Sequence, residues 1–303
     1  MSSGSSGLVA RRVSRRATFG PAFIAPYVIF LLLFGLVPAA YGVYNAFIVT
    51  PVVGDTYYSL TKNFEDVLGD YRLPSATANV AMYLAIWLPL LLIVVFGIAL
   101  LIDSKRSRFA GFTRFIVYVP GAVTGSAAAL LWLFMFSPTV SPISNLLKPL
   151  AGSNGLIISN QTLPFVLAVM GIAAGAGGWV VLLLGALSAI PKELIDAARV
   201  DAASTWQIIW HVKLPLLRRY AAFILIVSLA NGFQVFVEPQ VLGAGSIGQI
   251  SSTWSVNQLV YAYASEEANF GRASALSVVL LVVTVVAAII VIKKTNFYRV
   301  EGH

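Results

Sequence analysis

The sequence contains no cysteine and only two histidines, His211 and His303. These absences exclude disulfide frameworks, thiolate metal sites and cysteine nucleophiles, and they argue against a metal site or catalytic centre built from several histidines. Charge is also scarce, because Lys, Arg, Asp and Glu make up 11% of the 303 residues, against about 25% in an ordinary soluble domain. A water-soluble globular protein of this length would need more charged residues on its surface than this chain has. The composition therefore predicts an integral membrane protein.

Apolar residues are correspondingly abundant in the sequence. They account for 58% of the chain, and the mean hydropathy is +0.85. A membrane-spanning helix needs about 20 apolar residues, and the chain offers apolar stretches of that length at 21–48, 77–102, 115–136, 162–190, 220–242 and 273–292. The pattern predicts an all-α membrane protein with six transmembrane helices, preceded by a basic segment 1–20, interrupted by a loop 191–219 and followed by a tail 293–303.

The distribution of Lys and Arg predicts the orientation of these helices. Four of these residues precede the first stretch, four lie in 103–114, five lie in 191–219 and three follow residue 292, so 16 of the 20 fall on one side. Such a bias marks the cytoplasmic side, so we expect both termini to be cytoplasmic. The net charge of +8 is then a signature of topology and requires no nucleic-acid partner. The first apolar run is too long for a cleaved signal peptide, and we expect it to be retained.

The loop 191–219 has the pattern of two short helices. Glu193 and Ala197 suit a first helix that follows Pro191. Ser204 and Gln207 have the spacing of a capping box, which predicts a second helix after a turn near 201–204. Pro215 is expected to break that second helix before the fifth span. A folded loop on the cytoplasmic side is either a docking surface for a cytoplasmic protein or a helix pair on the membrane surface.

One spaced pattern in this loop resembles a known family. Asp196-Ala197-Ala198, three residues, Ala202, nine residues and Val212-Lys213-Leu214-Pro215 resemble the EAA loop of ATP-binding-cassette importer permeases, which has Glu-Ala-Ala, three residues, Gly, nine residues and Ile-x-Leu-Pro. The spacing agrees throughout, and Asp196 and Val212 are conservative replacements. Ala202 stands where the family has glycine, and this replacement argues against a left-handed turn there.

Other stretches resemble the maltose-type sugar permease that pairs with a second permease. They are Ala25-Pro26, Val37-Pro38 and 45–47 in the first span, 62–65 after it, 185–194 before the loop, 234–243 at the end of the fifth span and 270–276 before the sixth. Where the family often has Leu-Thr-Gly-Gly-Gly-Pro, this chain has Leu-Gly-Ala-Gly-Ser at 242–246.

The resemblance implies a type I importer permease fold in the plasma membrane of a prokaryote. It implies a heterodimer with a second related permease, two cytoplasmic ATPase subunits that bind ATP and Mg, and an extracytoplasmic solute-binding protein that delivers a di- or oligosaccharide. This chain would bind no cofactor of its own, and it has no GxxxxGK[ST] loop for a nucleotide phosphate. The loop would be the coupling helix against an ATPase, through Asp196, Ala197, Ala198, Asp201, Ala202, Leu214 and Pro215.

Polar residues in the fifth span are candidates for the substrate pathway, because buried polar groups in membranes are costly and often functional. Ser228, Asn231, Gln234 and Glu238 are spaced along one face of a helix. Trp179 and Phe233 are aromatic candidates for stacking on a sugar ring. The alternative for the amides is hydrogen bonding between helices, and for Glu238 it is a structural or gating role. Gly171 and Gly175 have the spacing of a close helix contact, and room for a ligand is the alternative.

Three other functions are alternatives to a sugar importer. A glycerol-phosphate-type or polyol importer is an alternative within the same class, although no Lys or Arg lies within the six spans to hold a phosphate. An ion-coupled secondary carrier would more often show an acid or histidine at the middle of a span, and Glu238 is the nearest candidate. An intramembrane enzyme is not supported, because GxSxG, HExxH and any His/Asp cluster are missing.

Overall fold

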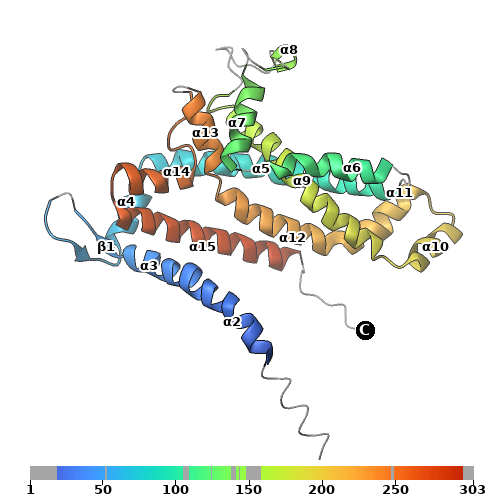
Figure 1. The fold of residues 1–303 in the computed structure, drawn as a ribbon, viewed down its shortest axis with the longest axis horizontal. Coiled ribbons are helices and arrows are strands. Elements are labelled where there is room, and N and C mark those ends of the chain that lie inside the picture. The colour runs from blue at the N-terminus through green and yellow to red at the C-terminus, as the bar shows by residue number, and fades with distance from the viewer. Residues whose placement is uncertain are drawn as a thin grey trace, which may run out of the picture.

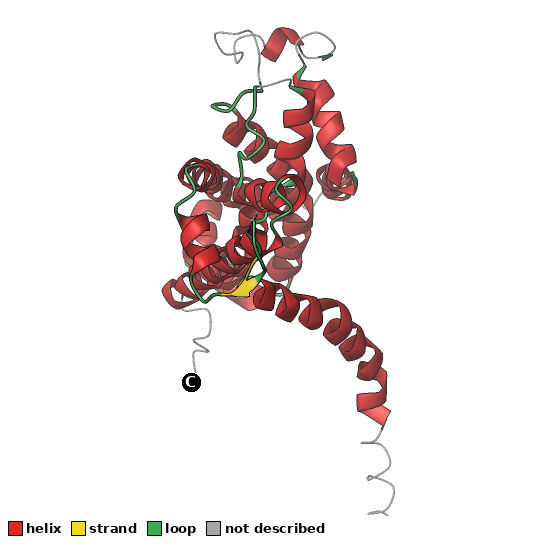
Figure 2. Cartoon of the chain, turned by 90° about the vertical axis from the view of Figure 1, so that its left-hand side faces the viewer, coloured by secondary structure: helices red, strands yellow, loops and turns green. Residues whose placement is uncertain are grey.

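The structure is a computed structural model, and it describes residues 19–51, 53–104, 109–123, 125–137, 141–142, 144–147, 158–246 and 249–295. Most of the basic segment 1–20 and the end of the tail 293–303, with the five Arg residues they contain, lie outside the described residues, as do four further cations, Lys105, Arg106, Arg108 and Lys148. Helices dominate the described part (Figures 1 and 2). The short strands β1 (Ile48–Val49) and β2 (Tyr57–Tyr58) pair antiparallel, with Ile48 opposite Tyr58.

The first span extends away from the rest of the chain (Figure 1). It consists of α2 (Phe19–Leu31), a π-helical turn η1 (Leu32–Leu36) and α3 (Val37–Asn45). Its membrane-length stretch Phe23–Asn45 has no buried residue in its most apolar window. Its α3 end contacts the long helix α15 (Phe270–Lys294). An apolar helix with so little cover from its own chain must be covered by lipid or another subunit.

The core forms where α5 (Arg72–Ser104) packs along α9 (Leu163–Ser188). On α5 the buried residues Trp87, Leu91, Val95 and Ala99 recur every four positions and so lie on one face of the helix. The α12 helix (Leu214–Phe233) packs against α5, α9 and α15. The helices α5, α9 and α15 lie at the predicted spans 77–102, 162–190 and 273–292, respectively, and α5 begins five residues earlier than expected.

Two of the predicted spans are each divided into two inclined helices, where the sequence predicts one helix. The stretch 115–136 is divided between α6 (Phe109–Tyr118) with the 3-10 turn η2 (Val119–Ala122) and α7 (Gly125–Phe136), which are inclined by 107°. Pro120 cannot donate a helical hydrogen bond, and Gly125 has φ of +65°, so the chain turns there. The stretch 220–242 is divided between α12 and α13 (Val237–Gly245), which are inclined by 45°.

Four helices in the described part are therefore long and apolar enough to cross a membrane alone, and six spans result if each bent pair counts as one. The remaining helices are short: α4 (Lys62–Leu68), α8 (Ser144–Leu147), α10 (Lys192–Val200), α11 (Thr205–Ile208) and α14 (Val256–Tyr261), with π-helical turns η4 (Ile209–Lys213) and η5 (Ala262–Glu266).

A network of ion pairs ties α4 and the starts of α5 and α15 together at the end opposite α10. Arg272 donates to Asp66 at 2.8 Å, and Arg72 donates to Asp70 at 2.7 Å and to Glu267 at 2.9 Å. Tyr263 adds a 2.5 Å hydrogen bond to Asp70. Two of the four cations that the sequence places on the non-cytoplasmic side thus hold helix ends in position.

Candidate functional site

The loop 191–219 folds into the two helices that the sequence predicts, α10 and α11. Ser204 caps α11: its hydroxyl accepts a hydrogen bond from the Gln207 amide at 3.3 Å, and the Gln207 side chain accepts one from the Ser204 amide at 2.7 Å. This capping box is confirmed. It fixes where the second helix begins and so sets the length of the turn between the two helices.

The turn between α10 and α11 is left-handed at Ala202, whose φ is +57°. The Ala202 amide donates to the Arg199 carbonyl and the Ala203 amide to the Ala198 carbonyl, both at 3.0 Å. This pair of bonds is a Schellman motif, which satisfies carbonyls at the end of α10. The expectation from the missing glycine was therefore wrong, because the two capping bonds offset the steric cost of alanine in this conformation.

Pro215 does not end the second helix, and this prediction was also wrong. The chain stays helical from Thr205 to Phe233. The π-helical turn η4 immediately precedes the proline, and within it the Leu214 amide bonds to the Ile209 carbonyl. The wider π turn moves the hydrogen-bond register at the position where Pro215 lacks an N–H, so the helix continues.

The loop projects beyond the ends of the long helices, with α10 at its tip (Figure 1). Of the seven coupling candidates, Asp196, Ala197, Asp201, Ala202 and Pro215 are exposed, and Ala198 and Leu214 are half-buried. Large apolar side chains are exposed beside them: Val200 is 87% exposed and Trp206 is 66% exposed. Trp206 and Trp210 meet edge to face at 5.7 Å. An exposed apolar patch with polar surroundings is typical of a protein or membrane contact.

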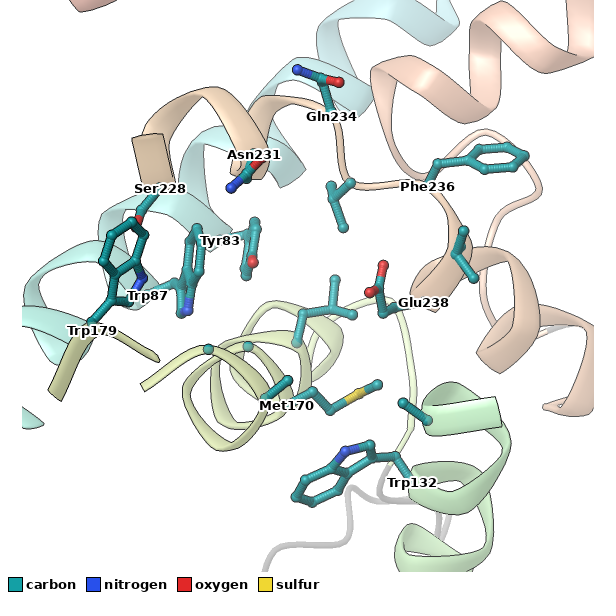
Figure 3. Close-up of a pocket in the computed structure, with 17 residues that line it drawn as sticks. Tyr83, Trp87, Trp132, Met170, Trp179, Ser228, Asn231, Gln234, Phe236 and Glu238 are labelled. Carbon is teal, nitrogen blue, oxygen red and sulfur yellow. The ribbon is translucent and has the colours of Figure 1, made fainter. Parts of the chain in front are cut away.

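A cavity of about 480 Å³ lies among α5, α7, α9, α12 and α13 (Figure 3). It gathers five of the six residues that the sequence proposes for a substrate pathway, namely Ser228, Asn231, Gln234, Glu238 and Trp179. The sixth, Phe233, does not line the cavity and packs instead against the hydrophobic core.

The polar residues reach the cavity from two helices, and the prediction of one continuous helical face was wrong. Ser228 and Asn231 lie on α12, Gln234 lies directly after its end, and Glu238 lies in the first turn of α13. The break at 234–236 directs the Glu238 carboxylate back toward the cavity, facing the side of Tyr83 (Figure 3).

Aromatic residues of α5 form one wall of the cavity. The rings of Tyr83 and Trp87 stack with centroids 5.3 Å apart. Two glycines make room for Trp87, because a Cβ at Gly171 would lie 2.7 Å from its Nε1 and a Cβ at Gly232 would lie 3.0 Å from its Cζ3. A Cβ at Gly175, which also lines the cavity, would meet nothing within 4 Å. Gly171 thus serves packing and Gly175 leaves open space, so the two alternatives weighed from the sequence each hold for one glycine.

Sequence reasoning missed Tyr83, Trp87 and Trp132 as lining residues. An aromatic residue in an apolar span has the same pattern whether it packs in the core or lines a cavity. Their position depends on which helices meet, and only the glycines at 171 and 232 hint at a large side chain opposite.

Two buried polar atoms of the lining residues have no hydrogen-bond partner within the described part of the chain: Trp87 Nε1 and Ser228 Oγ. An unsatisfied buried donor costs about 1–3 kcal/mol, and a water molecule or a ligand hydroxyl that reached these atoms would remove that cost. The cavity presents the Asn231 carboxamide, the Glu238 carboxylate and aromatic faces, which suit a ligand with many hydroxyls, whereas the Gln234 side chain points away and donates to the Ala230 carbonyl at 3.3 Å (Figure 3). The described residues contain no group of three or more His, Cys, Asp or Glu that would hold a metal ion.

Comparison with known proteins agrees with this architecture. Residues 82–293 match the family described as binding-protein-dependent transport system inner membrane component. The chain is 25% identical over 280 residues, covering 92% of it and 94% of the relative, to the probable starch degradation products transport system permease protein AmyD of Thermoanaerobacterium thermosulfurigenes. It is 26% identical to the arabinooligosaccharides transport system permease protein AraP of Bacillus subtilis, covering 92% and 89% of the two chains.

Two further similarities extend the range of relatives. The chain is 28% identical to the sn-glycerol-3-phosphate transport system permease protein UgpA of Agrobacterium fabrum, covering 86% and 89% of the two chains. A chain of a bacterial ABC transporter involved in import of the acidic polysaccharide alginate superposes with a TM-score of 0.75 at 20% identity, covering 96% of this chain and 99% of that one. At this identity the similarity establishes the fold alone.

Proposed function

Because this chain belongs to the family of binding-protein-dependent transport system inner membrane components, we propose that it is the permease subunit of an ATP-driven importer and forms half of the translocation pathway for a di- or oligosaccharide. The observation that carries the proposal is the cavity among α5, α7, α9, α12 and α13, which is lined by the stacked rings of Tyr83 and Trp87 and by the polar side chains of Asn231 and Glu238. Relatives named for starch degradation products and arabinooligosaccharides support a sugar as the solute.

The chain works with partner subunits in this proposal. Two ATPase subunits bind ATP and Mg, a second related permease supplies the other half of the pathway, and an extracytoplasmic binding protein delivers the sugar. The exposed first span supports the pairing, since the described residues leave almost all of its apolar surface uncovered. Both termini and the loop 191–219 face the cytoplasm, as the distribution of Lys and Arg indicates.

The loop is the coupling element of this proposal. Its helix α10 projects from the membrane helices and presents Asp196 and Ala197 to a partner. Asp196 pairs with a basic group of the ATPase, and the small Ala197 and Ala198 allow close approach of the helix. Closure of the ATPase dimer on ATP moves the loop and, through α12, the cavity, which is alternating access driven from a remote site.

Copurification tests the proposal. The chain is expressed with its cognate ATPase, second permease and binding protein, and the Asp196→Arg variant is compared with Glu266→Arg, which alters an exposed acid at the other end of the molecule. We expect Asp196→Arg to lose the ATPase and solute uptake and Glu266→Arg to keep both. Full uptake by this chain alone in proteoliposomes would refute the proposal.

The relatives named for sn-glycerol-3-phosphate transport favour one second candidate, a phosphorylated or polyol solute. Identification of the solute that copurifies with the cognate binding protein distinguishes the two candidates.

A further inference from the structure

The residues that line the cavity carry negative charge and no positive charge. Of its 17 lining residues, Glu238 is the only acid, and none is Lys, Arg or His. A site for a phosphate or a carboxylate ordinarily includes Arg or Lys. The solutes named for two of the similar proteins, sn-glycerol-3-phosphate and the acidic polysaccharide alginate, are anions, so the charge of this cavity is opposite to what such a solute requires.

No cation of the described residues compensates Glu238. Its side chain is half-buried, and within the described part of the chain it has neither a hydrogen bond nor an ion pair, while its carboxylate points into the cavity (Figure 3). The lining helices α7, α9 and α13 contain no Lys or Arg. On α12 the nearest cation is Arg219, 12 residues before Asn231, which is about 18 Å along the helix.

The one cation on α5 is already engaged elsewhere. Arg72 lies at the first turn of that helix, 11 residues before Tyr83 or about 16 Å along the axis. It is bound to Asp70 and Glu267 at 2.7 and 2.9 Å. The field inside the cavity is therefore set by one unpaired carboxylate in surroundings of low dielectric constant, where charge acts more strongly than in water.

We infer that Glu238 is a specificity-determining residue of the pathway, which selects uncharged or amino-bearing sugars and rejects uronic acids and sugar phosphates. The inference rests on the proposed function, because it assigns a solute class to the same cavity. The carboxylate accepts hydrogen bonds from sugar hydroxyls, which compensates its own desolvation. A second anion within about 6 Å would meet an unfavourable interaction that corresponds to about a 100-fold loss of affinity at an effective dielectric constant near 20.

The absence of native cysteine allows a direct measurement of this field. Ala128, on α7, lines the cavity, and Ala128→Cys is introduced into the complete transporter in nanodiscs, with the unmodified chain as background. The rates of modification by methanethiosulfonate reagents carrying ethyltrimethylammonium, ethylsulfonate or neutral hydroxyethyl groups are compared. We expect the cationic reagent to exceed the anionic one by at least tenfold, relative to the same ratio for free cysteine.

Further substitutions test whether Glu238 causes the preference for the cationic reagent. Glu238→Gln is expected to reduce the ratio about tenfold, and Asn231→Asp, which adds a second acid to the same cavity, is expected to increase it. Thr61→Cys, exposed at the start of α4, serves as a cysteine outside the cavity whose ratio Glu238→Gln leaves unchanged, and Glu266→Gln serves as a charge control that leaves the Ala128→Cys ratio unchanged.

An unchanged ratio in Glu238→Gln would overturn the inference, since another group, such as one on the second permease, would then set the charge. Absence of reaction with the neutral reagent at both Ala128→Cys and Ala174→Cys would also overturn it, because no solute would reach the carboxylate. The measurement needs no transported sugar, so its failure is distinct from a failure of the proposed importer to couple uptake to ATP.

Discussion

Lys213 Nζ donates a 2.5 Å hydrogen bond to Asp103 Oδ2 and so joins the end of the projecting loop to the last turn of α5. The two residues are 110 positions apart in the sequence. Both are mostly buried, with 11% of the Lys213 side chain and 28% of the Asp103 side chain exposed. A displacement of the loop would therefore be transmitted to α5, which forms the aromatic wall of the cavity, without passing through α12.

Removal of one partner of this pair is expected to destabilise the protein and weaken coupling. Lys213→Ala leaves Asp103 without its ion pair, and we expect a loss of about 1–3 kcal/mol in unfolding free energy together with a lower ratio of solute moved to ATP hydrolysed. Thermal unfolding in detergent and uptake by the reconstituted complex measure the two effects. The exposed pair Arg199–Asp196 is the matched comparison: Arg199→Ala should change stability by less than about 1 kcal/mol. Equal losses of unfolding free energy in Lys213→Ala and Arg199→Ala would show that the Lys213–Asp103 pair contributes no more to stability than an exposed ion pair.

The left-handed turn at Ala202 predicts opposite effects of glycine at two neighbouring positions. Ala202→Gly removes a Cβ from a residue with φ of +57° and should stabilise the protein by about 1 kcal/mol. Ala197→Gly, in the exposed interior of α10, should destabilise it by about 0.5–1 kcal/mol. Midpoints of thermal unfolding for the two variants test the difference in sign. A destabilising effect of Ala202→Gly would mean that the turn is not left-handed in the membrane-embedded protein.

The sequence predicts the broad architecture because the signals for it are local. Apolar runs of sufficient length locate the membrane helices, and the Ser204–Gln207 spacing locates the start of α11. The errors occur where the hydrogen-bond register changes: at Pro120 and Gly125, where the third span turns, and at Pro215, where a π-helical turn keeps the helix intact. Whether a proline ends a helix depends on the turn that precedes it, and the sequence does not display that turn.

The cavity could be predicted only in part, for a different reason. Polar residues stand out in an apolar span, so Ser228, Asn231, Gln234 and Glu238 were identifiable, and the structure brings them together. Phe233 was assigned to the cavity on its residue type alone, and it packs in the core. The contacts of α5 with α9 and α12 determine which aromatic side chains line the cavity. These contacts join distant parts of the sequence, so local sequence patterns do not reveal them.

A substitution at Ser228 can distinguish a role in solute binding from a role in helix packing. Its hydroxyl is buried and has no hydrogen-bond partner in the described part of the chain, so Ser228→Ala should leave stability unchanged or slightly increased, while it reduces solute affinity about fivefold to tenfold. Stability is measured by thermal unfolding without solute, and affinity by the concentration dependence of uptake. If Ser228→Ala lowered stability by more than about 1 kcal/mol with no change in affinity, the hydroxyl would be holding helices together.

The ion-pair network around Arg72 predicts a dependence of stability on pH. The hydrogen bond from Arg72, aided by one from Tyr263, holds the pKa of Asp70 well below its ordinary value of 3.8 despite partial burial. A depressed pKa means that the pair stabilises the folded state above pH 3.8, and this contribution is lost as the pH falls below that value. Asp70→Asn should therefore unfold at a lower temperature than the native protein at pH 7, and the difference should narrow below pH 4. The exposed Asp55→Asn serves as the control. A constant difference across this range would exclude the proton linkage.

The two glycines of α9 should respond in opposite ways to a single methyl group. At Gly171 the new Cβ would meet the Trp87 indole nitrogen at 2.7 Å, whereas at Gly175 it would meet nothing within 4 Å. Trp87 cannot retreat, because it stacks on Tyr83 and a Cβ at Gly232 would already lie 3.0 Å from its ring. We therefore expect Gly171→Ala to cost about 1–3 kcal/mol and Gly175→Ala to be neutral or stabilising by up to about 1 kcal/mol, as measured by thermal unfolding. Since Gly175 lines the cavity, its variant should instead lower uptake of longer oligosaccharides more than that of disaccharides. Equal tolerance of the two substitutions would mean that Trp87 is not wedged between α9 and α12 in the resting transporter.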